Sequence, residues 1–183
     1  MISESKSLIR KRLLELRDQL TMAAIQTRSI RIIEKIKAHP WYQEARIVGI
    51  YYPIGSEVNL LGLLQDHKEF CFPKIIDFSK TKMEFVRHTG VFHTGRFQLK
   101  EPPGEILPKQ DIDLIFVPGV AFSRTGVRIG YGKGFFDQYL QDYSHKTIGI
   151  GYEFQRMDYC PSDPWDRPLD EIITDEEDLC IQP

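Results

Sequence analysis

The chain has few cysteines and no long apolar run, and these two absences narrow the class of protein. It has three cysteines among 183 residues, and none of them stands in a C-x-x-C pair. The sequence therefore indicates neither a disulfide framework nor a zinc site of the Cys/His type. No apolar run reaches the ~18 residues of a membrane helix, and the first residues lack the apolar core of a signal peptide. We expect a cytoplasmic protein that does not enter a membrane.

An excess of one charge is also missing. The chain has 24 Lys and Arg against 26 Asp and Glu, a formal net charge of −2. Nucleic-acid-binding domains usually carry a strong basic excess, so we expect no nucleic-acid partner. The charges are nevertheless unevenly distributed along the chain. Residues 1–46 hold ten basic and five acidic residues, whereas residues 158–183 hold one basic and nine acidic residues. Either both segments are solvated surfaces, or the basic segment helps to hold an anionic ligand.

What is present is the composition of an ordinary globular domain. The apolar fraction is 42 % and the charged fraction 27 %, and a chain of this length can bury a core of its own. Apolar residues recur at helical spacing twice before His39-Pro40, which predicts two amphipathic helices at the start. Their apolar faces are expected to hold Ile9, Leu13, Leu16 and Leu20 in the first helix, and Ile25, Ile32, Ile33 and Ile36 in the second.

Apolar runs along the rest of the chain predict strands that alternate with helices. The strands are expected at 47–52, 70–72, 83–88, 91–97, 113–117 and 147–151, and the helices at 60–64 and 135–143, with a loop at 101–104. This alternation favours a mostly parallel sheet that is covered on both faces. The sequence contains no internal repeat and no long linker, so we predict a single α/β domain over residues 1–183.

The segment Gly126–Asp137 is the one that indicates chemistry. It follows the strongest predicted strand and runs into a predicted helix, and its glycines alternate with other residues at Gly130, Gly132 and Gly134. Backbone N–H groups that no side chain covers, next to the start of a helix, suit the binding of phosphate. Lys133 adds a positive charge to this segment, and Arg128 can add a second. The pattern therefore predicts a phosphate site.

The pattern is not that of a P-loop. Val127 stands where a P-loop requires glycine, and Gly134 stands where it requires the Ser or Thr that binds magnesium. A metal ion would need a carboxylate instead, and Asp137 is the nearest one. The same residues also admit a structural interpretation, in which the glycines form a tight turn and Lys133 pairs with Asp137 on the surface. On these residues alone the chemistry of the site stays open.

Four motifs in a fixed order are more specific than the glycines alone. They are Lys6-x-x-x-Arg10, Pro53-x-x-x-Glu57, the run Val117–Ser123 with Gly126 and the block Gly130–Asp137, and Asp166-x-x-x-Asp170-x-Ile172-x-Thr174. Together they resemble the signature of the 5-formyltetrahydrofolate cyclo-ligase (methenyltetrahydrofolate synthetase) family over nearly the whole chain. The resemblance implies a three-layer α/β/α domain with a mostly parallel central sheet, the NagB/RpiA/CoA-transferase-like fold.

The resemblance also implies a reaction. In this family, an ATP- and Mg²⁺-dependent ligase closes the ring of 5-formyltetrahydrofolate to give 5,10-methenyltetrahydrofolate, ADP and phosphate. The oxygen of a formamide is a poor leaving group, and its phosphorylation would let N10 of the folate attack the formyl carbon. Phosphoryl transfer needs alignment and charge neutralisation more than covalent help from the protein. We therefore expect a monomeric enzyme whose partners are ATP and a reduced folate.

The family's functional residues are carried over position by position. The resemblance implies catalytic roles for Lys133 and Arg128, and magnesium ligation by Asp137 and Asp166. It implies ATP contacts from Lys6, Arg10, Arg128, Gly130, Tyr131, Gly132, Lys133, Gly134, Phe135 and Phe136. It implies folate contacts from Tyr52, Glu57, Phe97, Tyr131 and Phe135. Phe135 and Phe136 stand where the family usually has two tyrosines.

Two other classes of function are alternatives to this interpretation. Related α/β sheets carry phosphosugar isomerases, which need no ATP, and acyl-CoA transferases, which normally use a nucleophilic glutamate. Glu153, after the last strong strand, is the only loose candidate for that nucleophile. A non-catalytic folate- or nucleotide-binding module would bind its ligand tightly without consuming ATP.

Overall fold

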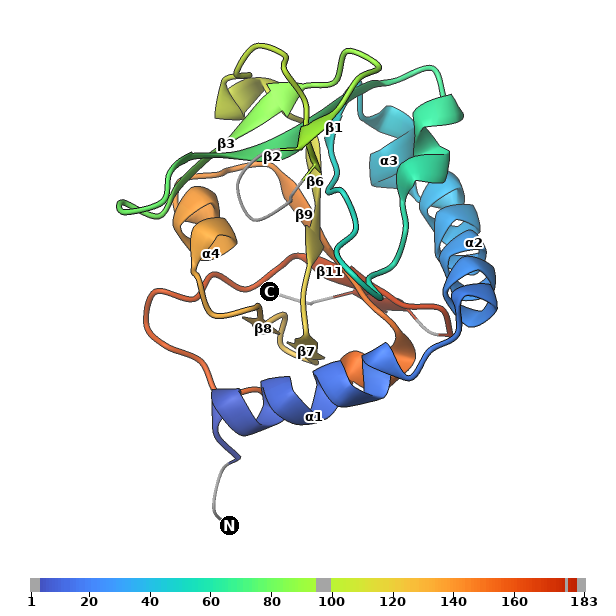
Figure 1. The fold of residues 1–183 in the computed structure, drawn as a ribbon, viewed down its shortest axis with the longest axis vertical. Helices are drawn as coiled ribbons and strands as arrows, with labels where there is room; N and C mark the ends of the chain where they lie inside the picture. Colours follow the sequence, from blue (N-terminus) through green and yellow to red (C-terminus); the bar gives the residue numbers. More distant parts are fainter. Residues whose placement is uncertain (1–3, 95–99, 177, 181–183) are drawn as a thin grey trace.

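A computed structural model of the chain describes residues 4–94, 100–176 and 178–180. At its centre is a seven-stranded sheet in the order β12 (Asp178–Cys180), β11 (Glu171–Ile173), β9 (Lys146–Ile150), β6 (Leu114–Pro118), β1 (Ile47–Gly49), β2 (Glu69–Asp77) and β3 (Lys82–Arg87) (Figure 1). Neighbours from β11 to β2 pair in parallel, and the antiparallel pairs are the outer ones. The predicted, mostly parallel sheet is confirmed.

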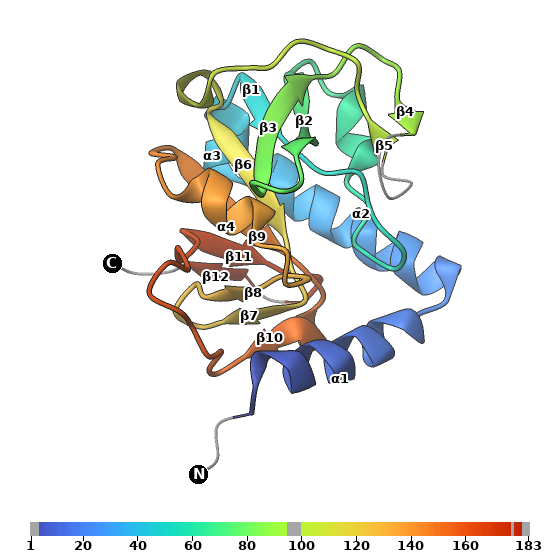
Figure 2. The same cartoon turned by 60° about the vertical axis from the view of Figure 1, so that its left-hand side comes forward.

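Helices cover both faces of this sheet. α2 (Met22–Ala38) and α3 (Pro40–Glu44) pack on one face, and α4 (Phe135–Leu140) packs on the other (Figures 1 and 2). Each face has its own apolar core, one with Ile32 and Ile36 against Val48 and Phe116, the other with Tyr139 and Leu140 against Phe85, Ile115 and Val117. The middle strand β6 is buried on both sides, which explains its unbroken apolar run. This is the expected three-layer arrangement.

α1 (Lys6–Asp18) lies apart from these layers, across a small sheet. That sheet has the order β10 (Arg156–Met157), β7 (Ala121–Ser123) and β8 (Arg128–Ile129), and Figure 2 shows α1 running beneath it. Ile9 and Leu13 of α1 are buried here against Val120, Ala121 and Ile129. The hydroxyl of Ser5 begins the helix by accepting the N–H of Leu8 at 3.4 Å.

Several elements differ in length from the prediction. The strand predicted at 47–52 ends at Gly49, and the helix predicted at 135–143 ends at Leu140. The loop predicted at 101–104 begins inside β5 (Lys100–Glu101), which pairs with β4 (His93–Thr94). Of the strand predicted at 91–97, residues 95–97 lie outside the described residues. Among the residues that the structure describes, the other short helices are η1 (Leu61–Gln65), η3 (Lys109–Asp111) and η4 (Glu153–Gln155). In the described part of the chain, no helix has the length and apolar character to cross a membrane.

The buried face of α1 also differs from the prediction. Leu16 is 42 % exposed, so its assignment to the apolar face is wrong. The buried residues of the helix are Ile9, Leu13 and Arg17, which follow one another at intervals of four. An arginine therefore continues the apolar stripe of this helix into the interior of the protein.

We predict that Phe122→Ala lowers the free energy of unfolding by about 3–5 kcal/mol. Phe122, on β7, is fully buried, and its ring lies so close to Gly149 that an added Cβ there would come within 2.8 Å of it. Urea denaturation followed by tryptophan fluorescence measures the loss. The control is Ile30→Ala on α2, because Ile30 is 48 % exposed. A loss no larger than that of the control would contradict the structural role of Phe122.

Candidate active site

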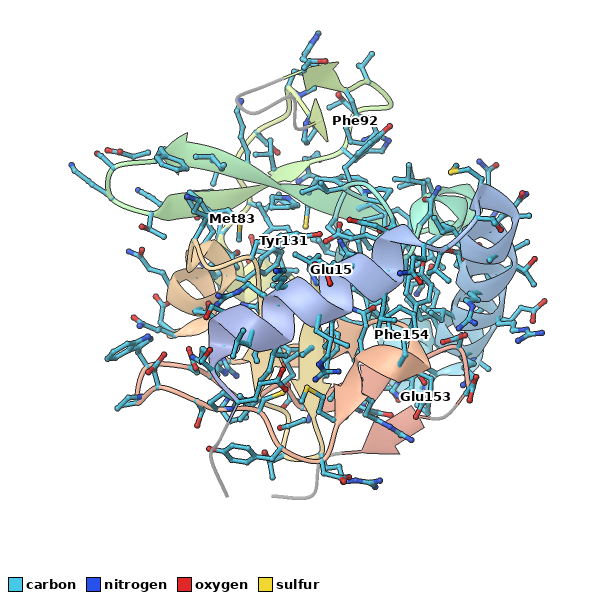
Figure 3. The ribbon with its side chains drawn as sticks, turned by 60° about the horizontal axis from the view of Figure 1, so that its bottom comes forward. Glu15, Met83, Phe92, Tyr131, Glu153 and Phe154 are labelled. Atoms are coloured by element: carbon cyan, nitrogen blue, oxygen red, sulfur yellow. The ribbon has the colours of Figure 1, made fainter. Side chains whose placement is uncertain are left out.

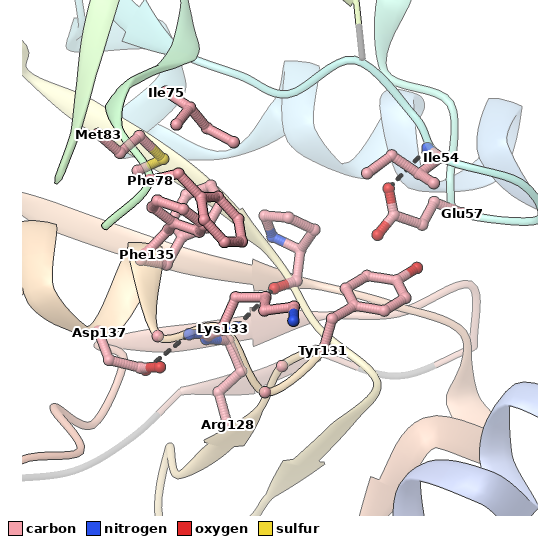
Figure 4. Close-up of a pocket in the computed structure, with 15 residues that line it drawn as sticks. Ile54, Glu57, Ile75, Phe78, Met83, Arg128, Tyr131, Lys133, Phe135 and Asp137 are labelled. Atoms are coloured by element: carbon pink, nitrogen blue, oxygen red, sulfur yellow. Dashed lines mark hydrogen bonds and ion pairs between the residues drawn. The ribbon is translucent and has the colours of Figure 1, made fainter. Parts of the chain in front are cut away.

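A cavity of about 280 Å³ lies at the carboxyl ends of β1 and β6. These strands are parallel neighbours, and ligands of open α/β sheets bind at such ends. Its walls come from the turn after β1 with Ile54 and Glu57, from the β2–β3 hairpin, and from the segment that follows β8 (Figure 4). The lining residues are Ile54, Glu57, Ile75, Phe78, Met83, Pro118, Arg128 and the stretch 130–137. The glycine segment predicted to bind phosphate therefore forms one wall of this cavity.

The glycine segment owes its shape to two left-handed residues. Gly132 and Gly134 have φ angles of +89° and +73°, a region that side chains other than glycine rarely adopt. Lys133 stands between them, and Figure 4 shows its side chain extending into the cavity. Its ammonium makes no ion pair with any residue that the structure describes, and it lies 5.8 Å from the centre of the Phe78 ring. The helix that follows has only six residues, so Lys133 supplies the main positive potential here.

Arg128 and Asp137 are bound to each other at the edge of the cavity. The Arg128 side chain is 6 % exposed, and its Nη2 donates to Oδ1 of Asp137 at 2.6 Å. Its Nη1 donates to the carbonyl oxygen of Pro118 at 3.2 Å, and its guanidinium lies 5.7 Å from the centre of the Phe136 ring. The predicted catalytic cation and the predicted magnesium ligand thus neutralise each other.

α1 carries the other two predicted ATP contacts, which do not line the cavity themselves, and one of them reaches the glycine segment. Arg10 donates from Nε to the carbonyl oxygen of Gly130 at 2.6 Å. Lys6 donates from Nζ to Asp163 at 2.6 Å and to Asp166 at 2.5 Å. Burial opposes the charged ammonium, but these hydrogen bonds outweigh it and raise the pKa of Lys6 above its ordinary value. Asp166, the second predicted magnesium ligand, is therefore also paired with a predicted ATP contact.

The carboxylates of this region fit magnesium only together with a nucleotide. Within residues 4–94, 100–176 and 178–180, three or more His, Cys, Asp or Glu side chains nowhere gather in a way that suits a metal ion. Mg²⁺ in nucleotide sites commonly takes one or two carboxylates and completes its octahedron with phosphate oxygens and water. Asp137 lines the cavity beside the glycine segment and provides one such carboxylate. The donor set thus suits a magnesium–nucleotide complex rather than a metal held by the protein alone.

Glu57 presents a buried carboxylate on the opposite wall. The residue is 4 % exposed, and its Oε2 accepts the N–H of Ile54 at 2.8 Å. Its Oε1 is buried without a hydrogen-bond partner, which costs stability and calls for a donor from a ligand. Burial raises the pKa of Glu57, and the positive charge of Arg17 partly opposes this rise. Buried titratable groups of this kind in a cavity are characteristic of functional sites.

Arg17 is a residue near the cavity that the motifs do not identify. It is 3 % exposed and donates from Nε to Oγ of Ser56 at 3.1 Å and from Nη2 to the hydroxyl of Tyr131. Figure 3 shows Tyr131 beside α1, which carries Arg17. Burial raises the pKa of Tyr131 to about 12, so its phenol stays neutral and accepts the hydrogen bond. The only sequence signal for this contact is that Arg17 continues the stripe of Ile9 and Leu13.

The predicted aromatic contacts are only partly brought to the cavity. Phe135 and Phe136 line it, and their rings pack against Phe78 and Phe85 with centroids 5.6 and 6.3 Å apart. Tyr52 does not line the cavity; its ring packs edge-on against Phe92 at 5.2 Å. Phe97 lies outside the described residues.

Glu153, the loose candidate for a transferase nucleophile, is engaged elsewhere. Its Oε2 accepts the hydroxyl of Thr174 at 2.6 Å, and its Oε1 pairs with Arg156 at 2.5 Å. It does not line the cavity, and Figure 3 shows it well away from Tyr131. The geometry gives no support to a glutamate nucleophile in this site.

Comparisons with known proteins agree on one family. The sequence profile of the 5-formyltetrahydrofolate cyclo-ligase family matches residues 2–175. The 5-formyltetrahydrofolate cyclo-ligase of Mycoplasma genitalium is 38 % identical over 133 residues, which cover 69 % of this chain and 70 % of that protein. The NMR structure of 5,10-methenyltetrahydrofolate synthetase from Aquifex aeolicus matches with a TM-score of 0.87 and 32 % identity, covering 97 % of this chain and 93 % of that one. The synthetase from Mycoplasma pneumoniae matches with a TM-score of 0.77 and 27 % identity, covering 94 % and 100 %.

We predict that Glu57→Gln gains stability relative to the parent protein as the pH rises. Burial raises the folded-state pKa of Glu57 above its unfolded value, so the folded protein disfavours the ionised carboxyl. This penalty is absent below the unfolded pKa of about 4.3 and is complete above the folded pKa. Glutamine does not ionise, and the difference in unfolding free energy should therefore shift towards the variant as the pH rises above the unfolded pKa, until the folded pKa is passed. Urea denaturation at each pH measures it.

The matched control is Glu34→Gln, because Glu34 is exposed on α2. The other titrating groups are the same in each variant and in the parent, so their contributions cancel in the difference in unfolding free energy. A difference for Glu57→Gln that is independent of pH, or that shifts towards the parent at higher pH, would contradict the buried carboxyl.

Proposed function

The chain belongs to the 5-formyltetrahydrofolate cyclo-ligase family, and we propose that the cavity between the glycine segment and Glu57 is its active site. The protein is an enzyme that converts 5-formyltetrahydrofolate to 5,10-methenyltetrahydrofolate with the use of ATP. Such an enzyme must hold a triphosphate and a reduced folate next to each other. One observation carries the proposal: within the described residues, the cavity has an unpaired ammonium, that of Lys133, on one wall and an unpaired carboxylate oxygen, that of Glu57, on another.

We propose that the phosphates of ATP bind along residues 130–134. Gly132 and Gly134 leave the backbone N–H groups accessible, and the Lys133 ammonium supplies a full positive charge. Arg10, bonded to the carbonyl of Gly130, supports the role of α1 in this contact, and Lys6 lies on the same helix four residues earlier. The cations suit phosphate because charge-assisted hydrogen bonds are stronger than neutral ones.

The folate is proposed to bind on the side of Glu57. The pterin ring offers several N–H donors, and Oε1 of Glu57 is a buried acceptor without a hydrogen-bond partner among the described residues. Ile54, Phe78, Met83 and Phe135 line the same cavity and provide apolar cover for the ring. Tyr131 lines the cavity as well and belongs to the glycine segment, so it would lie between the two ligands.

The proposed reaction proceeds in two displacements. The formyl oxygen attacks the γ-phosphorus of ATP, and the bond from that phosphorus to ADP breaks. N10 of the folate then attacks the formyl carbon and loses its proton, and the phosphate departs with the electrons of the carbon–oxygen bond. Lys133, and Arg128 once released from Asp137, would neutralise the charge on the transferring group.

Magnesium is proposed to bind with the nucleotide, with Asp137 as a ligand and Asp166 as a second one. When bound, the ion would neutralise phosphate charge and fix the orientation of the phosphates. Asp137 is paired with Arg128 and Asp166 with Lys6, so both carboxylates would have to leave these cations in order to bind the metal ion. Once released, both cations are available to the phosphates.

We also propose that residues 1–183 form one catalytic domain that acts as a monomer. The use of ATP supports a cytoplasmic location. The transferase alternative is not supported, because its candidate nucleophile, Glu153, is bonded to Thr174 and Arg156. No particular observation favours the isomerase alternative.

We predict that Lys133→Ala lowers kcat/KM by about 10²–10³, the usual cost of removing one group that stabilises a developing charge. The assay follows the absorbance of methenyl-folate, with and without ATP and Mg²⁺. Lys11→Ala on the exposed face of α1 is the control and should be as active as the parent. Equal rates for Lys133→Ala and the parent, with both proteins folded, would remove Lys133 from the phosphate site.

We predict that Asp137→Asn raises the Mg²⁺ concentration needed for half-maximal rate by about tenfold or more, because a neutral amide is a weaker ligand for this hard cation. Activity at saturating Mg²⁺ should recover in part. Asp158→Asn, at a side chain that is 89 % exposed, is the control. An unchanged Mg²⁺ requirement would show that Asp137 serves only as the partner of Arg128.

A further inference from the structure

α1 contributes a third cation to the site, after Lys6 and Arg10. Arg17 follows Arg10 by seven residues, about two helical turns, and so lies on the same face of the helix. Unlike the first two, it is almost completely buried, with 3 % of its surface exposed. A buried charged side chain is costly unless it is bonded, and its partners therefore indicate what it does.

The guanidinium of Arg17 ties α1 to both walls of the cavity. Its Nε donates to the hydroxyl of Ser56, the residue before Glu57, and that hydroxyl in turn donates to Oδ1 of Asp18 at 2.6 Å. Its Nη2 donates to the hydroxyl of Tyr131 in the glycine segment, whose ring centre lies 5.6 Å from the guanidinium carbon. The Arg17 side chain thus holds Ser56, which precedes Glu57, and also Tyr131, which belongs to the glycine segment.

The charge of Arg17 also acts on Glu57. The titratable and charged groups that act on this carboxylate are Arg17 of α1, Tyr131 of the glycine segment and Tyr51, while Asp18 of α1 and Tyr152 bond to the neighbouring Ser56. Arg128 and Lys133 line the same cavity. Arg17 favours the ionised form of Glu57, whereas burial opposes it.

We propose that Arg17 is a positioning residue for folate binding, whose guanidinium holds Tyr131 and Ser56 in place and directs its positive charge towards Glu57, which faces the pterin N–H groups. The inference rests on the proposed function only in that the folate binds against Glu57. Arg17 makes no hydrogen bond to Lys133 or to the backbone of residues 130–134, whereas Arg10 bonds to the carbonyl of Gly130. Loss of Arg17 should therefore affect folate more than ATP.

The test compares Arg17→Met, which keeps the length of the side chain, with Arg17→Lys, which keeps its charge. For Arg17→Met we expect the KM for folate to rise about tenfold or more, while the KM for ATP changes by less than about twofold. The acid limb of kcat/KM for folate should move to higher pH, because Glu57 without Arg17 stays protonated to higher pH. Arg17→Lys should return this limb towards that of the parent without restoring the full affinity, since an ammonium lacks the planar fork.

Two further variants separate charge from position. Tyr131→Phe removes the hydroxyl that Arg17 bonds, and it should raise the KM for folate while moving the acid limb less than Arg17→Met does, because this hydroxyl also favours the ionised form of Glu57 but carries no charge. In a Glu57→Gln background, Arg17→Met should produce no shift of that limb. These variants keep the proposal testable even if Arg17→Met does not fold, which urea denaturation of each variant establishes.

Arg12→Met is the matched control, because Arg12 lies on the same helix, is 48 % exposed and pairs with Glu4 outside the cavity. It should leave both KM values and the pH profile unchanged. The proposal is overturned if the Arg17 variants lose stability alone, or if their KM values for ATP and folate rise equally with no shift of the acid limb. If the parent protein forms no methenyl-folate with ATP, the proposed function fails instead, and the two failures are distinguishable.

Discussion

The packing of α1 against β7 and β8 is the contact on which the rest of the site depends. Ile9 and Leu13 are buried there, and burial of such a side chain contributes roughly 1.5–3 kcal/mol. This apolar contact fixes the direction in which the same helix presents Lys6, Arg10 and Arg17. It also offsets part of the cost of taking the Arg17 guanidinium out of water. A shift of the helix by one turn would separate all three cations from their partners.

The charged side chains in and near the cavity are mostly paired with one another. Arg128 is paired with Asp137, and Lys6 with Asp166, while Lys133 has no ion-pair partner among the described residues. On the proposed mechanism, a magnesium–triphosphate complex would let these pairs exchange partners, with the cations moving to phosphate and the carboxylates to the metal. The exchange would trade one set of charge pairs for another, because these groups are already partly removed from water in the folded protein.

Much of the fold can be predicted from the sequence, because strands and helices follow local apolar patterns. The run 47–52 shows where this fails. Only Ile47–Gly49 form β1, yet Ile50 and Tyr51 remain buried while the chain turns towards Glu57. An apolar run records burial and not strand pairing, so it does not tell where the strand ends. The strand therefore ends three residues earlier than predicted, and this end sets the position of Glu57.

The site divides in the same way between local and tertiary features. The glycine segment with Lys133 is local in sequence, so its phosphate-binding character is visible there. The role of Arg17 is not visible in the sequence. An analysis of periodicity that counts arginine as polar assigns Leu16 to the buried stripe instead. The bonded partner of Arg17, Tyr131, is also 114 residues away in the sequence. The informative signal is that intervals of four from Ile9 lead to an arginine. A charged residue on an apolar stripe needs a bonded partner in the interior, and a cavity lined by ligand-binding groups is a place to look for one.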